Sequence, residues 1–125
     1  MSAYEWADIA SSHLNNALAT YAITLTLASA YLAAAFVAGN KLTRTQLTLI
    51  NSVFVPAMLY NILTSMRTQI MYIDARNAAH ELEPQLAVFP EYAIIPSLTI
   101  SLLIPLAILF ISIIFMLDIR KTKLD

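Results

Sequence analysis

Three long stretches without a charged side chain constrain this sequence more than any other feature. They cover residues 9–40, 45–66 and 92–117, and they hold 32, 22 and 26 residues without Asp, Glu, Lys or Arg. A helix that crosses a bilayer needs about 20 predominantly apolar residues. The sequence therefore predicts an all-α integral membrane protein in which residues 1–125 form a single domain with three transmembrane helices.

Composition supports a membrane environment and excludes several kinds of chemistry. The chain is 59% hydrophobic and 12% charged, whereas soluble domains average about 45–50% and about 25%. A net charge of −1 gives no field that would attract nucleic acid. The chain has no cysteine for thiolate chemistry and a single glycine, too few for a phosphate-binding loop. We expect no cofactor and no nucleic-acid partner.

Local signals set the expected ends of the helices. Ser2 and Glu5 match a capping box, so the first helix should cover residues 3–38. The second helix should cover 45–82, because the sequence has no stop signal at Arg67 and Pro84 gives the first stop after it. The third is expected at 93–117. At 1.5 Å per residue the first two exceed a hydrocarbon core of about 30 Å, so we expect a long antiparallel pair that projects outward from the membrane.

The distribution of Lys and Arg predicts the orientation. Three spans place the first loop and the C-terminus on one side, which carries Lys41, Arg44, Arg120, Lys121 and Lys123. The other side carries Arg67 and Arg76. The positive-inside rule then predicts an outer N-terminus and a cytoplasmic C-terminus, in an inner or plasma membrane.

Polar residues within the second span indicate a buried face. Asn51, Asn61, Ser65 and Thr68 fall within roughly 100° on a helical wheel, and such a stripe must face protein or water. On the third helix, the line through Ser97, Ser101, Pro105 and Ser112 should likewise face the bundle.

Two similar segments, SVFVP at 52–56 and SLLIP at 101–105, each place a proline four residues after a serine. Each proline removes one helix hydrogen bond and leaves the carbonyl of that serine free. One interpretation is a midplane polar pocket of the transporter type, and the other is ordinary helix packing with proline kinks. The residues of this set are Asn51, Ser52, Pro56, Asn61, Ser101 and Pro105.

Small residues recur at every fourth position of the first helix, where they would let a second backbone approach closely. This predicted helix–helix contact consists of Ala22, Thr26, Ala30, Ala34 and Ala38.

The short turn near residue 42 also predicts a register. Residues at the same height on the two antiparallel helices should have numbers that add up to about 84. This arithmetic places Thr24 near Tyr60, and Asp8 beside Arg76 as an exposed ion pair outside the membrane.

No catalytic or metal site is predicted. His13 and His80 both lie outside the hydrocarbon depth, and all eight acids lie outside the charge-free windows. His80 and Glu83 could share one helical face and hold a metal, but we interpret them as part of a solvated helix end. We therefore expect a protein that is not an enzyme.

These observations favour an accessory or structural subunit of a larger membrane protein complex. The alternatives are a homo-oligomeric small transporter or channel built around the two prolines, and a holin-like pore former. The expected partners are membrane lipids and other membrane protein subunits, and self-association is possible.

Overall fold

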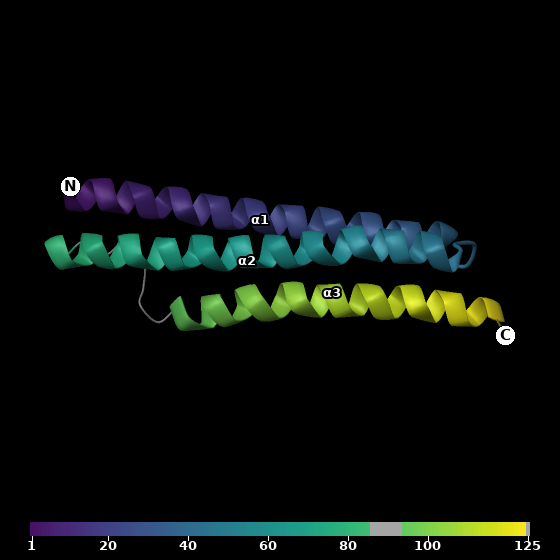
Figure 1. Ribbon diagram of the computed structural model, residues 1–125. Helices are drawn as coiled ribbons and strands as arrows, with labels where there is room; N and C mark the ends of the chain where they lie inside the picture. The colour runs from purple at the N-terminus through teal and green to yellow at the C-terminus, as the bar shows by residue number, and fades with distance from the viewer. Residues whose placement is uncertain (86–93, 125) are drawn as a thin grey trace.

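The computed structural model describes residues 1–85 and 94–124, and within these ranges the chain is helical with no strand. The helices are α1 (Ala3–Ala38), α2 (Arg44–Leu82) and α3 (Ile94–Leu124), drawn in Figure 1. All three are long and apolar enough to cross a membrane. The predicted all-α class with three helices of this kind is confirmed.

Capping boxes begin both long helices. At α1, the Ser2 hydroxyl accepts from the Glu5 amide over 3.2 Å, and the Glu5 carboxylate accepts from the Ser2 amide over 2.6 Å. Thr43 and Gln46 repeat this arrangement at α2, with distances of 3.2 and 2.9 Å. Both pairs satisfy amides that have no partner within the helix. The sequence analysis identified only the first pair, and the second fixes the start of α2 at Arg44.

Helix α3 continues past the expected end at residue 117 to Leu124. The end of the apolar window marks a change in side-chain polarity, not the end of a helix. Residues 118–123 contain neither glycine nor proline, so nothing in them interrupts the helix. The expected start at residue 93 lies outside the described residues.

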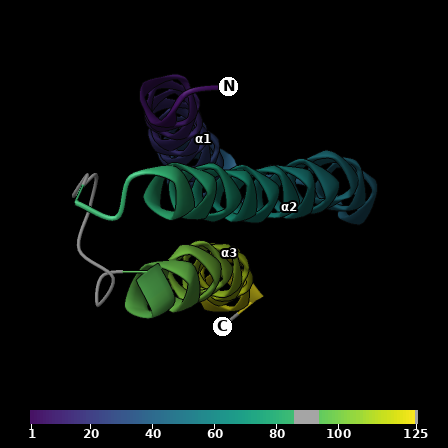
Figure 2. The same ribbon diagram turned by 90° about the vertical axis from the view of Figure 1, so that its left-hand side faces the viewer.

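The helices pack side by side, with α2 between α1 and α3 in both Figure 1 and Figure 2. Contacts between α1 and α2 join Thr20 to Asn61, Tyr31 to Asn51, and Tyr31 to Phe54. The numbers of these pairs add up to between 81 and 85. The predicted antiparallel register is therefore confirmed to within three residues.

A seven-residue repeat explains which face of each long helix is buried. The buried residues of α1 recur at intervals of seven: Ala3, Ala10, Ala17, Thr24 and Tyr31. On α2 three buried lines follow the same repeat. Ile62, Gln69 and Arg76 lie at intervals of seven, whereas Phe54, Asn61 and Ala75, and likewise Met58, Ser65 and Ala79, lie at intervals of seven and fourteen. A repeat of seven keeps one line facing the partner when two helices coil gently around each other.

The small residues at every fourth position of α1 do not form the contact with α2. Ala22, Thr26 and Ala30 are exposed, and Ala34 and Ala38 are half-buried. Each step of four residues turns about 40° beyond a full turn, so this line drifts around the helix. It reaches the side of the buried residues only near its end.

The largest apolar core lies where all three helices meet, near the turn between α1 and α2. It contains Tyr31, Ala35, Phe54, Met58, Leu109 and Met116. The rings of Tyr31 and Phe54 stack with centroids 4.0 Å apart. Beside this core, the Arg120 guanidinium donates from Nη1 to the Leu42 carbonyl over 2.6 Å, which ties the end of α3 to the turn.

Candidate functional site

A line of polar side chains, which we call the polar seam, runs along the buried side of α2. Because the surrounding side chains are largely apolar, these polar groups need hydrogen-bond partners from neighbouring helices. The members of the polar seam are Asn51, Asn61, Gln69 and Arg76, and all except the half-buried Asn51 are buried. Two other members of the predicted stripe are less engaged with neighbouring helices. Ser65 is buried, and the half-buried Thr68 donates to the Thr64 carbonyl of its own helix.

Asn61 joins the middle of α2 to the middle of α1. Its amide nitrogen Nδ2 donates to the main-chain oxygen of Thr20 over 2.8 Å and also to the Thr24 hydroxyl. The hydroxyl of Thr20 donates in turn to the Ala17 carbonyl over 2.6 Å. A buried amide without partners is costly, so these bonds make Asn61 compatible with an apolar interior.

Asn51 joins the two helices nearer the turn. The Tyr31 hydroxyl donates to the Asn51 Oδ1 over 2.6 Å. Sequence reasoning missed Tyr31, although it is the one tyrosine that the register places opposite the start of the polar stripe. Its ring packs in the apolar core while its hydroxyl is satisfied by Asn51, a common compromise for a buried tyrosine.

Gln69 joins α2 to α3 by donating from Nε2 to the hydroxyl of Ser101, and both side chains are buried. Sequence reasoning missed Gln69 because it lies just beyond the second charge-free window. Its spacing of seven from the buried Ile62 would have placed it on the same side of α2.

The residues of the possible midplane pocket do not meet in the described part of the chain. Ser101 lies against Gln69, and α2 advances about 27 Å at 1.5 Å per residue between Asn51 and Gln69. Ser52 is exposed, and its hydroxyl donates to the Leu49 carbonyl of its own helix. The two serine–proline segments lie at similar distances from the starts of α2 and α3. Antiparallel helices place such positions at opposite heights, which is why the segments do not meet.

The two prolines also differ in their surroundings. Pro56 is exposed on α2, whereas Pro105 is buried on α3 together with Ser101 and Ser112. The side chain of Ser97, the fourth member of that line, lies outside the described residues. The prolines therefore do not share one site.

Arg76 is not part of an exposed pair with Asp8. Asp8 is exposed, but Arg76 is only 6% exposed, and its Nη1 donates to the Asn77 Oδ1 over 3.5 Å. The register places these residues at the same height, but Arg76 follows Gln69 by seven residues. It therefore lies on the line of α2 that meets α3, and not on the line that meets α1.

At the end of α2, His80 and Glu83 do not gather with further metal ligands in the described part of the chain. His80 is exposed and Glu83 is half-buried. Among the described residues, no three His, Cys, Asp or Glu side chains are grouped so that they could hold a metal ion.

The side of α1 that faces away from α2 carries a second line of small residues, which we call the outer α1 face. It consists of Ala19, Ala22, Thr26, Ser29 and Ala33, all exposed. Their spacing alternates between three and four residues, so they stay on one side of the helix. Exposed bulky side chains lie around this face: Leu18, Ile23, Leu25, Phe36 and Val37.

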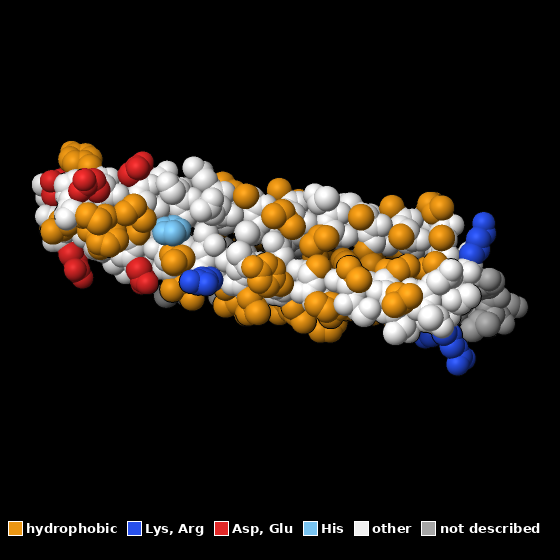
Figure 3. Space-filling view, turned by 45° about the horizontal axis from the view of Figure 1, so that its top comes forward, with side chains coloured by type: hydrophobic (Ala, Val, Ile, Leu, Met, Phe, Trp, Pro, Cys, Tyr) orange, Lys and Arg blue, Asp and Glu red, His pale blue; other side chains and the backbone are white. Residues whose placement is uncertain are grey.

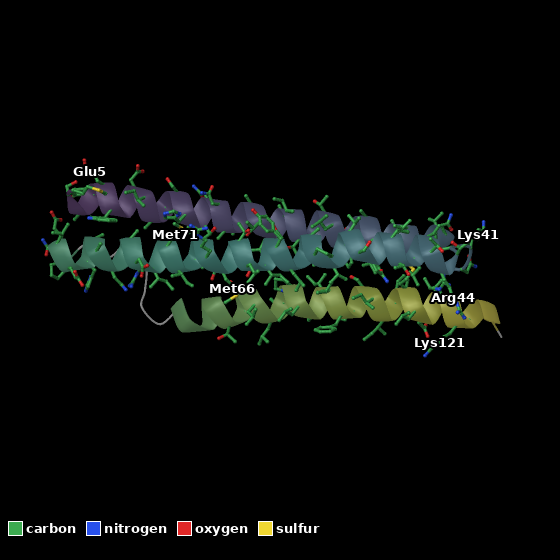
Figure 4. The ribbon with its side chains drawn as sticks, viewed as in Figure 1. Glu5, Lys41, Arg44, Met66, Met71 and Lys121 are labelled. Atoms are coloured by element: carbon green, nitrogen blue, oxygen red, sulfur yellow. The ribbon has the colours of Figure 1, made fainter. Side chains whose placement is uncertain are left out.

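Charge is separated along the bundle. On the face shown in Figure 3, acidic side chains gather at one end and basic side chains mark the other. Figure 4 places Glu5 at the first end, and Lys41, Arg44 and Lys121 together at the second. The long apolar surface lies between these two ends.

These features describe a small antiparallel three-helix protein whose helices have the length and composition for a membrane. Comparison of the chain with protein-family models, characterised proteins and solved structures finds no match. The functional argument therefore rests on the chain's own geometry.

Proposed function

We propose that this protein is a non-enzymatic accessory or structural subunit of a larger membrane protein complex. The observation that carries the proposal is the outer α1 face, a line of small side chains within an apolar helix that is exposed on the outside of the bundle. Within a membrane, helices associate through close backbone approach, which small side chains permit.

The buried side of α1 shows that a line of small side chains can pack against neighbouring helices in this chain. Ala10, Ala17, Thr24 and Ala28 are buried there against the rest of the bundle. The outer α1 face has the same character, with three alanines, one threonine and one serine. Helix α1 thus has small side chains on two opposite sides, and α2 occupies one of them. A transmembrane helix of another subunit would occupy the second.

The surroundings of the outer α1 face suit an apolar partner. Thr26 donates its hydroxyl to the Ala22 carbonyl over 2.9 Å, so it needs no polar group from a neighbour. Leu25 and Phe36 are 58% and 77% exposed, and they would add apolar contact beside the small residues. We place the N-terminus outside and the C-terminus in the cytoplasm, in an inner or plasma membrane, because of the positive-inside rule.

The test is the composition of the assembly isolated in a mild detergent, determined by mass measurement of the intact particle. Unlike chains bound in fixed stoichiometry support the proposal. An assembly made only of copies of this chain favours the homo-oligomeric transporter or channel instead. A monomer without partners overturns both.

A matched pair of variants tests the face itself. Ala22→Leu adds bulk to the outer α1 face and should release the partner chains. Ala107→Leu makes the same change at an exposed position of α3 and should leave the assembly intact. Equal behaviour of the two variants would exclude the outer α1 face as the contact.

A further inference from the structure

The end of the bundle at the turn between α1 and α2 carries a cluster of cations, which we call the basic end. It consists of Lys41, Arg44 and Lys121, which Figure 4 labels, and of Arg120, whose guanidinium contacts the Leu42 carbonyl. We propose that the basic end binds the headgroup phosphates of anionic phospholipids. The inference rests on the three helices crossing a membrane, but it needs no partner subunit.

Tertiary structure assembles the basic end from distant parts of the chain. Arg120 donates to the Leu42 carbonyl over 2.6 Å although the two residues are 78 positions apart. This bond holds the end of α3 against the turn that carries Lys41. A guanidinium has five N–H groups, so Arg120 keeps others for an anion. The cations from the turn and from α3 therefore lie at one end of the bundle as a group.

The charge of this group is positive. Lys41, Arg44 and Lys121 are exposed and Arg120 is half-buried. Asp118, also exposed, is the acidic residue of the described part of the chain at this end. Four cations against one carboxylate attract anions, and the exposed side chains have the reach to adjust to a fluid headgroup layer.

The position of the basic end favours a lipid over a soluble anion. Exposed apolar side chains lie close to these cations along the chain, namely Phe36 and Val37 near the end of α1, Leu49 on α2 and Leu117 on α3. The cations therefore follow the edge of the apolar surface, at the depth where lipid phosphates lie. A soluble phosphate would have no contact with these apolar neighbours, whereas a phospholipid can occupy both regions at once.

The experiment reconstitutes the purified full chain in vesicles of phosphatidylcholine and phosphatidylglycerol in equimolar amounts. The lipids retained by the protein are then counted by native mass spectrometry. We expect phosphatidylglycerol to be retained in clear excess. The triple variant Lys41→Gln, Arg44→Gln, Lys121→Gln should lose about a hundredfold in this preference, since each cation near the surface contributes about fivefold. Arg120 stays unchanged because it holds the turn.

Arg67→Gln is the control, because Arg67 is an exposed cation away from the basic end. It should retain the preference of the wild-type chain. An equal loss in Arg67→Gln would show general charge attraction and overturn the proposal. Displacement of the lipid by inorganic phosphate would also overturn it, in favour of a soluble anion.

Insertion is measured separately by flotation of the vesicles after an alkaline wash, and helix content by circular dichroism. A chain that inserts but shows no lipid preference overturns this inference and leaves the proposed subunit role untouched. A chain that does not insert overturns the membrane assignment, and this inference falls with it.

Discussion

Asn61 of α2 donates a hydrogen bond from Nδ2 to the main-chain oxygen of Thr20 in α1 over 2.8 Å. This bond joins the two long helices about midway along their contact, and it is reinforced by the hydroxyl of Thr24. A polar side chain thereby sets which residues of two largely apolar helices lie at the same height.

Asn61→Leu should weaken the pairing of α1 with α2. The change keeps the approximate size of the side chain but removes both hydrogen bonds. Such bonds in membranes average about 0.6 kcal/mol and reach about 2 kcal/mol in model peptides. We expect a loss within that range in the free energy of unfolding, measured in detergent by denaturant titration. Leu103→Ala, at a position 57% exposed, should change it little. Equal stability of Asn61→Leu and wild type would show that this bond does not hold the register.

The pair Gln69 and Ser101 should be coupled. Ser101→Ala leaves the buried Gln69 amide without this acceptor, which costs about 1–3 kcal/mol of stability. Gln69→Leu combined with Ser101→Ala removes both partners and should be more stable than Ser101→Ala alone. A double-mutant cycle on the free energy of unfolding measures the difference. Strictly additive effects would contradict a direct contact between α2 and α3 at these residues.

Gly39→Ala should disturb the turn between α1 and α2 and weaken its contact with α3. A Cβ at position 39 would overlap the Ala35 carbonyl and come within 3.2 Å of the Ile119 Cγ2. Gly39 has an ordinary right-handed conformation, so close approach is the reason for glycine here, and not its backbone freedom. We expect a loss of about 1–3 kcal/mol in thermal or denaturant unfolding, as for overpacked cores. Asn40→Ala, at the exposed neighbouring position, is the control and should be close to neutral.

The proposed orientation predicts opposite labelling of the two ends of the chain. The sequence has no cysteine, so single cysteines introduced at Ser2 and Thr122 can be probed without background. A thiol reagent that does not cross membranes should label position 2 in intact cells, and position 122 only after lysis. Both residues are exposed, so burial in the bundle does not limit the reaction. Labelling of position 122 from outside would overturn the orientation.

The sequence by itself determined the number and order of the helices, and the bounds of α1 and α2 to within one residue. The charge-free windows reflect the thickness of an apolar layer, and the capping box at Ser2 and Glu5 reflects hydrogen bonds made within one turn. These are local properties, so they can be recognised before the chain is folded. The register of α1 against α2 followed as well, because a short turn fixes equal heights on antiparallel helices.

Only the tertiary structure decided which side of each helix is buried and which polar groups meet. The fourfold spacing at Ala22, Thr26 and Ala30 suggested one face of α1, but packing in the bundle buried the line with a spacing of seven at Ala10, Ala17 and Thr24. Which face is buried depends on the partner helix, so the sequence of one helix alone does not determine it.

Packing between helices also determined the partners of the polar residues. Arg76 lies on the line of α2 that meets α3, and Ser101 pairs with Gln69 instead of lining a pocket with Asn51. The height at which α3 packs against α2 depends on contacts between distant parts of the chain. The connection between α2 and α3 is longer than the turn between α1 and α2. The sequence therefore predicted a register for α1 and α2 but none for α3. Packing of α3 against both other helices, anchored by Arg120 at Leu42, decided these partners.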